Sequence, residues 1–151
     1  MELITPHITY REATHSDTAA RHGIDNTPGA VELSRMRVLA LRVFEPLRKG
    51  LGNRPIYLSS FFRCTKLNKA VKGSKKSQHI RGEAMDIDND NNPDGPTNLE
   101  IFNYIRDNLE FDQLIREEGN DQSPAWVHVS FSAGNNRHQV LRSKNGKYYS
   151  L

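Results

Sequence analysis

The chain reads Ser77-Gln78-His79-Ile80-Arg81-Gly82-Glu83-Ala84-Met85-Asp86 at the point that decides its fold. The end of this stretch alternates apolar and polar side chains, as a strand with one polar face does. Gly82 permits a sharp bend between His79 and Asp86. Without such a bend, the intervening strand would span more than about 20 Å, and one metal ion could not bind both side chains. The stretch therefore predicts a turn that brings a histidine and an aspartate together.

A second histidine lies in a segment with the two-residue period of a strand, Ala125-Trp126-Val127-His128-Val129-Ser130-Phe131. Trp126, His128 and Ser130 are expected on one face, and the two valines on the other face, toward the core. Two histidines and a carboxylate, with a fourth position left for water, form a known catalytic zinc arrangement. Cys64 is the only cysteine, so any metal must be bound by histidine and carboxylate. The alternative is that one histidine is a satisfied core residue and the other a turn residue.

The most regular element is a helix predicted from Val31 to Leu51, in which apolar side chains recur every three or four residues. Thr27 and Pro28 suit its N-cap and first turn, and glycines suit its end. Pro46 predicts a kink or an early stop. We interpret this helix as scaffold.

Shorter elements are predicted on both sides of this helix. Ser16-Asp17-Thr18 caps a short helix that ends at Gly23, within an otherwise irregular N-terminal stretch. Thr97 caps a second helix, from about Asn98 to Leu109. The other expected elements are a small helix at Leu67–Val71 and strands at Ile56–Ser60, Ala84–Asp88, Asp112–Glu117, Trp126–Phe131 and Val140–Ser143, the last paired with Lys147–Ser150 through Asn145-Gly146. Because helices come first and an antiparallel meander last, we expect an α+β fold in one domain of residues 1–151, an antiparallel sheet packed against helices.

The composition excludes several classes of protein. A chain of 151 residues with 36% hydrophobic and 26% charged residues fits one soluble domain. No run approaches the roughly 18 apolar residues of a membrane span, and the N-terminus does not have the pattern of a secretory signal. The formal charge of +3 is too small to predict nucleic-acid binding, although a basic nucleic-acid-binding domain stays one alternative. We expect a monomer with no nucleic-acid partner and no membrane insertion.

The polar run from Asp88 to Gly95 is expected to be a loop. Its second part, Asp90-Asn91-Asn92-Pro93-Asp94-Gly95, resembles the opening of an EF-hand calcium loop. Ile101, however, occupies the twelfth position, where an EF-hand has a bidentate glutamate. A plain turn-rich loop is therefore favoured over a calcium site.

The stretch from Ser77 to Asp86 resembles the Ser-x-His-x-x-x-x-x-x-Asp motif of the peptidase M15 family, the D-alanyl-D-alanine carboxypeptidases and related peptidoglycan endopeptidases. Trp126-Val127-His128 resembles the later histidine motif of that family. Three further segments are similar to family segments: Leu58–Cys64, Leu67–Val71 and His22–Pro28, the last as in short, phage-type members. The resemblance covers nearly the whole chain. It implies the small α+β fold that the family shares with the hedgehog signalling domain.

The resemblance also implies that His79, Asp86 and His128 bind one zinc ion. Many family members have an acid three residues before the final histidine, but this chain has Ala125 there. A second pattern, seen in the hedgehog relatives and the short members, places the acid on the preceding strand, where Glu117 ends Asp112–Glu117. A carboxylate beside the metal would take a proton from the attacking water and later deliver it to the leaving amine. Glu118 is the rival, although on a strand it points to the opposite face.

Two further residues receive substrate-binding roles. Arg63 matches the family's substrate-side arginine, and its guanidinium offers paired donors to a carboxylate of a cell-wall peptide. Ser77 matches a serine near the metal and could hydrogen-bond a ligand or substrate. As alternatives, Arg63 is one of 21 basic residues, and Ser77 is an ordinary turn serine.

Together these patterns predict a zinc peptidase that cleaves peptidoglycan stem peptides. Carboxypeptidase action on a terminal D-Ala-D-Ala and endopeptidase action within the stem both stay open. A zinc-bearing cell-wall-binding module without catalysis is the alternative. The resemblance to phage-type lysis enzymes implies cytoplasmic synthesis, followed by action on the cell wall after release.

Overall fold

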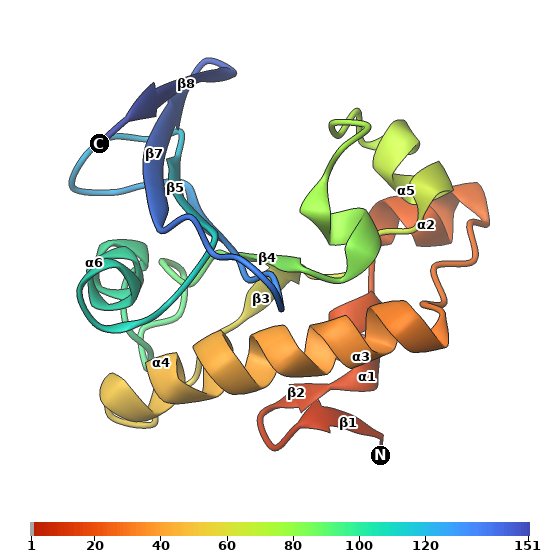
Figure 1. Ribbon diagram of the computed structural model, residues 1–151, viewed down its shortest axis with the longest axis horizontal. Coiled ribbons are helices and arrows are strands. Elements are labelled where there is room, and N and C mark those ends of the chain that lie inside the picture. Colours follow the sequence, from red (N-terminus) through yellow and green to blue (C-terminus); the bar gives the residue numbers. More distant parts are fainter. Residues whose placement is uncertain (1) are drawn as a thin grey trace.

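A computed structural model describes residues 2–151 and is organised around a six-stranded sheet (Figure 1). The strands lie in the order β3-β4-β6-β5-β7-β8. Their bounds are Leu58–Ser60 for β3, Ala84–Ile87 for β4, Gln113–Glu117 for β5, Trp126–Ser130 for β6, Gln139–Lys144 for β7 and Lys147–Ser150 for β8. Strands β5 and β7 run parallel, and the other neighbouring strands are antiparallel.

The expected α+β class is confirmed, but the sheet is mixed and not wholly antiparallel. After β6 the chain crosses the end of β5 and continues on the far side of β5, so β6 and β7 are not neighbours. The hairpin predicted through Asn145-Gly146 is confirmed. Strands β7 and β8 are antiparallel, and Lys144 and Lys147, on either side of this turn, are paired.

The long helix runs from Ala30 to Gly50 as α3 (Ala30–Leu39), a π-helical segment η1 (Ala40–Phe44) and α4 (Glu45–Gly50). Proline lacks an N–H and its ring crowds the carbonyl four residues earlier. The wider π-helical turns end just before Pro46 and allow the helix to continue past the proline. The irregularity predicted at Pro46 is therefore a π-helical segment, and the helix does not stop there. The predicted cap at Thr27 is wrong: Gly29 is the N-cap, and the Thr27 hydroxyl donates to Asp25.

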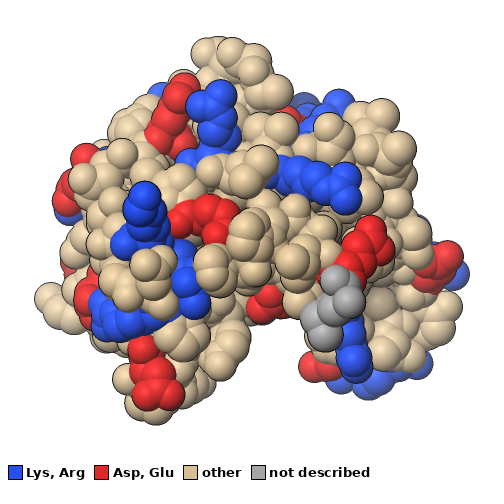
Figure 2. All heavy atoms as spheres, turned by 90° about the horizontal axis from the view of Figure 1, so that it is seen from below, with Lys and Arg blue, Asp and Glu red and all other residues tan. Residues whose placement is uncertain are grey.

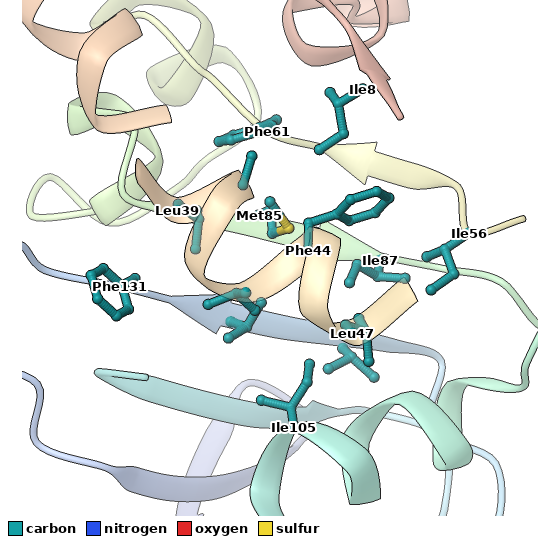
Figure 3. Close-up of a cluster of buried hydrophobic side chains, with 14 of the residues drawn as sticks. Ile8, Leu39, Phe44, Leu47, Ile56, Phe61, Met85, Ile87, Ile105 and Phe131 are labelled. Atoms are coloured by element: carbon teal, nitrogen blue, oxygen red, sulfur yellow. The ribbon is translucent and has the colours of Figure 1, made fainter. Parts of the chain in front are cut away.

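One face of the sheet packs against this helix and forms the core (Figure 3). Leu39, Phe44 and Leu47 lie over Met85 and Ile87 of β4 in this view. The core side also includes fully buried residues of β5, β6 and helix α6 (Asn98–Asn108): Leu114, Val127, Val129, Ile101, Phe102 and Ile105. Successive side chains of a strand point to opposite faces. Asp86 and His128 therefore lie on the other face, away from the core.

The N-terminal stretch was expected to be irregular apart from one short helix, and this expectation is wrong. Strands β1 (Leu3–Thr5) and β2 (Ile8–Thr9) pair with each other, and helix α1 (Tyr10–Thr14) follows. Glu45 of α4 accepts hydrogen bonds from Thr5 and His7, which fix this hairpin to the long helix. The helix predicted after Ser16 is confirmed as α2 (Asp17–His22), which ends at a left-handed Gly23.

The small helix predicted at Leu67–Val71 is confirmed about two residues earlier, and a 3₁₀ helix that was not predicted precedes the turn at Gly82. Helix α5 covers Thr65–Ala70, and the 3₁₀ helix η2 covers Gln78–Arg81. Thr97 and Glu100 form the reciprocal capping box at the start of α6. In the polar loop before α6, Asp90 accepts a hydrogen bond from the backbone of Asn98, so this acid caps a helix.

Two surface features bear on partners. Figure 2 shows basic and acidic side chains interspersed over the face seen there, without a field of a single sign. Within residues 2–151, no helix combines the length and the apolar character that crossing a bilayer requires.

An ion pair between the buried Asp112 and the exposed Arg137 holds the crossing between β6 and β7 in place. Asp112 accepts hydrogen bonds from the backbone and guanidinium of Arg137 and from the side chain of Gln78. These contacts, the guanidinium first, lower the pKa of Asp112 to about 2 from an ordinary 3.8. Since the folded pKa lies below the unfolded pKa, the carboxylate stabilises the fold above about pH 4, and this contribution is lost as the pH falls through about 2.

Asp112→Asn is therefore expected to lower the thermal midpoint at pH 7 and to flatten its dependence on pH between about 4 and 2. Thermal unfolding followed by circular dichroism at each pH tests this. Asp107→Asn is the control, because the Asp107–Arg106 pair is exposed and worth little. The expectation fails if both variants follow the wild-type pH dependence.

Candidate metal centre

Three elements bring His79, Asp86 and His128 together. His79 lies on η2, Asp86 on β4, and His128 directly opposite Asp86 on β6. Gly82, between η2 and β4, has a φ of +76°. A Cβ at this glycine would lie 2.5 Å from the backbone oxygen of Glu32 on α3. The turn therefore requires glycine both for its left-handed backbone and for its close approach to the long helix.

The aspartate lies between the two imidazoles. Asp86 Oδ2 is 3.3 Å from His79 Nε2, and Asp86 Oδ1 is 2.9 Å from His128 Nδ1. One ligand atom from each residue lies within 4.8 Å of the other two, and no other group of three or more such side chains occurs within residues 2–151. The rings of His79 and His128 meet edge to face, with centroids 5.3 Å apart. The spacing is that of three side chains converging on one point.

The electrostatics favour a charged carboxylate. Burial by itself would raise the pKa of Asp86, but the neighbouring imidazoles of His79 and His128 outweigh it and hold that pKa well below the usual range. The Asp86 carboxylate is therefore anionic at neutral pH.

The protonation of His79 tests whether a metal fits. Its Nδ1 lies 2.7 Å from the backbone oxygen of Phe61, an acceptor, so Nδ1 carries the proton and Nε2 keeps a lone pair. Nε2 is buried and has no hydrogen-bond donor within the described residues. A buried lone pair beside an anionic carboxylate is unfavourable unless a cation joins them. A carbonyl behind a ligating histidine is also the usual outer partner in metal sites. The three residues thus fit a divalent cation.

A cleft of about 470 Å³ opens over these three residues. Its lining residues come from the segment around α5 and η2 and from the sheet, including the β7–β8 hairpin. Residues from the first side are Arg63, Lys72, Gly73, Ser74, Lys76, Ser77 and Gln78, and residues from the sheet are Gln113, Ile115, Glu117, Trp126, Leu141 and Tyr148. One side is therefore basic, and the other carries an acid and two aromatic rings.

Glu117 ends β5 opposite Trp126 and lines the cleft. Its side chain is nearly buried, and one oxygen accepts a hydrogen bond from the Ser143 hydroxyl. Burial raises the pKa of Glu117, Asp86 and Glu118 add to the rise, and Ser143 and His128 partly offset it. A carboxylate with a raised pKa beside a metal site suits proton transfer.

The rival acid lies elsewhere. Glu118 follows the end of β5 with a φ of +49°, and its carboxylate accepts hydrogen bonds from the backbone of Asn145 and Gly146. It holds the tip of the β7–β8 hairpin and does not line the cleft. Of the two acids, only Glu117 lines the cleft over the candidate centre.

Arg63 and Ser77 both line the cleft. The Arg63 guanidinium is partly buried, and its Nε has no hydrogen-bond partner within the described residues. Burial lowers the pKa of Arg63, and the charge of Asp86 partly offsets this. The Ser77 hydroxyl accepts a hydrogen bond from the His79 backbone and thereby caps η2. Their substrate roles stay predictions, and Ser77 has in addition a structural role.

Sequence reasoning missed Ser143, Tyr148 and the lysines at 72 and 76. The turn signal at Asn145-Gly146 and the period of two were enough to pair Ser143 with Tyr148. Their position beside Glu117 depends on the parallel pairing of β5 with β7, which no local pattern indicates.

Ser143→Ala is expected to raise the pKa of Glu117, because the variant loses the O–H that stabilises the ionised carboxylate while its burial remains. Carboxyl carbon NMR across pH 4 to 8, with the metal state held constant, measures this pKa. Ser143→Thr keeps the hydroxyl and should titrate like the wild type. Equal pKa values in the alanine variant and the wild type would contradict the expectation.

Comparison with known proteins agrees with this geometry. A search of curated proteins gave no significant match. Residues 6–130 match the family described as Peptidase M15. The matched region includes the three converging side chains and Glu117, and it covers most of the chain. The chain therefore belongs to the peptidase M15 family.

Proposed function

We propose that this protein is a zinc metallopeptidase that hydrolyses peptide bonds in peptidoglycan stem peptides. The observation that carries the proposal is the convergence of His79, Asp86 and His128 beneath a cleft that also contains Glu117. Family membership supports peptidase activity. Two neutral histidines and one carboxylate form a ligand set that suits zinc and leaves room for water and substrate.

The ligand residues would hold the ion from one side, and Phe61 keeps His79 in the tautomer that binds it. When bound, zinc supplies a Lewis acid that acidifies water and polarises a carbonyl. Residues of the chain perform the proton transfer and bind the substrate.

Glu117 takes a proton from the attacking water and delivers it to the nitrogen of the leaving amine. Its nearly buried position keeps bulk water from competing for this proton, and Ser143 fixes one of its oxygens. Arg63 binds an anionic group of the substrate, since it lines the cleft and a guanidinium offers paired donors to a carboxylate. The neighbouring Lys72 and Lys76 make that side of the cleft favourable for acidic peptides.

The test is incubation with a defined stem pentapeptide ending in D-Ala-D-Ala, with and without a chelator, and identification of the products by mass. We expect cleavage that the chelator abolishes and added zinc restores. Cleavage that survives complete removal of metal would contradict the mechanism. Zinc binding without cleavage of any stem peptide would favour the cell-wall-binding module.

A blocked substrate separates the two modes of cleavage. A carboxypeptidase requires the free terminal carboxylate, so amidation of the last D-Ala should stop it. An endopeptidase should cleave the amidated and the free peptide alike.

A further inference from the structure

The β7–β8 hairpin (Gln139–Ser150) forms one wall of the cleft, although it lies beyond the matched residues 6–130. Leu141 and Tyr148 of this hairpin line the same cleft as Glu117 and the three candidate ligands. In Figure 1, β7 and β8 extend the sheet past β5, on the side away from β4. The hairpin therefore completes a site that the matched region leaves open on one side.

The strand register places three polar groups in one row. Ser143 is the partner of Glu117 across the parallel β5–β7 pair and of Tyr148 across the antiparallel β7–β8 pair. Residues paired across strands share a face of the sheet. Glu117, Ser143 and Tyr148 therefore lie on the face that carries His128. The first two are buried, whereas Tyr148 is 60% exposed at the open end of the row.

The position of Tyr148 suits contact with a ligand. Burial and the negative charges of Glu117 and Asp86 raise its pKa above 10, so at neutral pH the phenol is a hydrogen-bond donor. It lines the same cleft as Arg63 and Lys72, which come from the segment around α5 and η2. A peptide in the cleft would thus meet cations on one side and a neutral donor on the other. Carbonyl oxygens are the acceptors that such a peptide offers.

We propose that Tyr148 is a substrate-contacting residue, whose ring forms a wall of the peptide site and whose hydroxyl donates a hydrogen bond to a carbonyl oxygen of the bound peptide. The inference rests on the proposed function, because that function supplies the peptide that Tyr148 contacts. It goes beyond that function in assigning part of the site to the C-terminal hairpin.

The neighbouring residue provides a matched control. Tyr149 is half exposed on the same strand, but its partner is Arg142, so it lies on the opposite face of the sheet. Trp126 is the only tryptophan and lines the cleft, so its fluorescence reports peptide binding without requiring cleavage.

The experiment compares Tyr148→Phe, Tyr148→Ala and Tyr149→Phe with the wild type, using the D-Ala-D-Ala pentapeptide as the probe. Loss of one donor to a transition-state oxyanion costs about 10²-fold or more in kcat, and loss of a hydrogen bond to an ordinary carbonyl oxygen costs less. We expect Tyr148→Phe to lower kcat/KM at least about tenfold, with zinc content and circular dichroism unchanged. Tyr148→Ala should also weaken the binding seen by Trp126 fluorescence, and Tyr149→Phe should match the wild type.

The two proposals fail in different ways. If the wild type binds the peptide but does not cleave it, the peptidase proposal fails, and the dissociation constant of Tyr148→Phe then decides the role of the hydroxyl. A Tyr148→Phe protein with wild-type kcat/KM and dissociation constant overturns the inference. A wild-type Trp126 signal that no stem peptide alters overturns it as well.

Discussion

Glu117→Gln is expected to reduce kcat by about 10²- to 10⁴-fold, the usual contribution of a general base and acid. The amide keeps the shape of the side chain and can still accept the hydrogen bond from Ser143, but it cannot take a proton from water. Metal content should stay at the wild-type level, because Glu117 is not one of the three converging side chains. Initial rates on the stem pentapeptide and zinc analysis of the same sample measure both quantities.

Glu118→Gln is the matched control, since Glu118 holds the hairpin tip outside the cleft. It should hydrolyse the peptide at close to the wild-type rate. If Glu117→Gln keeps full activity, or Glu118→Gln loses it, Glu117 is not the base.

Asp86→Asn is expected to abolish metal binding at micromolar zinc, and hydrolysis with it. The amide is neutral and no longer balances the charge that a divalent ion brings to two neutral imidazoles. The loss of affinity should exceed the roughly 10- to 100-fold typical of changing an outer partner of a ligand. Zinc titration by calorimetry, with activity measured in parallel, tests this.

Asp88→Asn provides the comparison, because Asp88 follows the same strand but is exposed and hydrogen-bonded to Asn98. Its zinc affinity should equal that of the wild type. An Asp86→Asn protein that binds zinc as tightly as the wild type would remove the aspartate from the ligand set.

The sequence predicts best where a signal is local. Trp126, His128 and Ser130 alternate with two valines, and the two valines are fully buried in the core as predicted. The cap at Thr97 is local in the same sense, because a serine or threonine followed by glutamate at the third position satisfies free N–H groups within one turn. His79 and Asp86 also come together through a local feature, because Gly82 forms the turn between them.

What the sequence does not predict depends on contacts between distant segments. Strands β1 and β2 have three and two residues, too few for a period to be visible, and they are fixed by Glu45 of the long helix. The parallel pairing of β5 with β7 arises from a crossing that Asp112 and Arg137 hold in place across 25 positions. The same pairing brings Ser143 to Glu117, so the missed part of the site and the misjudged sheet order have one cause.

The alternation along β4 and β6 has a consequence for errors in folding. Asp86 and His128 are immediate neighbours of core residues in the chain, so a slip of one strand by a single position would bury the ligands and expose the apolar side chains. Such a misfolded form would lose the stabilisation of the core and the metal together. Under the proposed function, uptake of the ion would therefore indicate that the strands have paired in the correct register, and metal loading during refolding would select the correctly paired molecules.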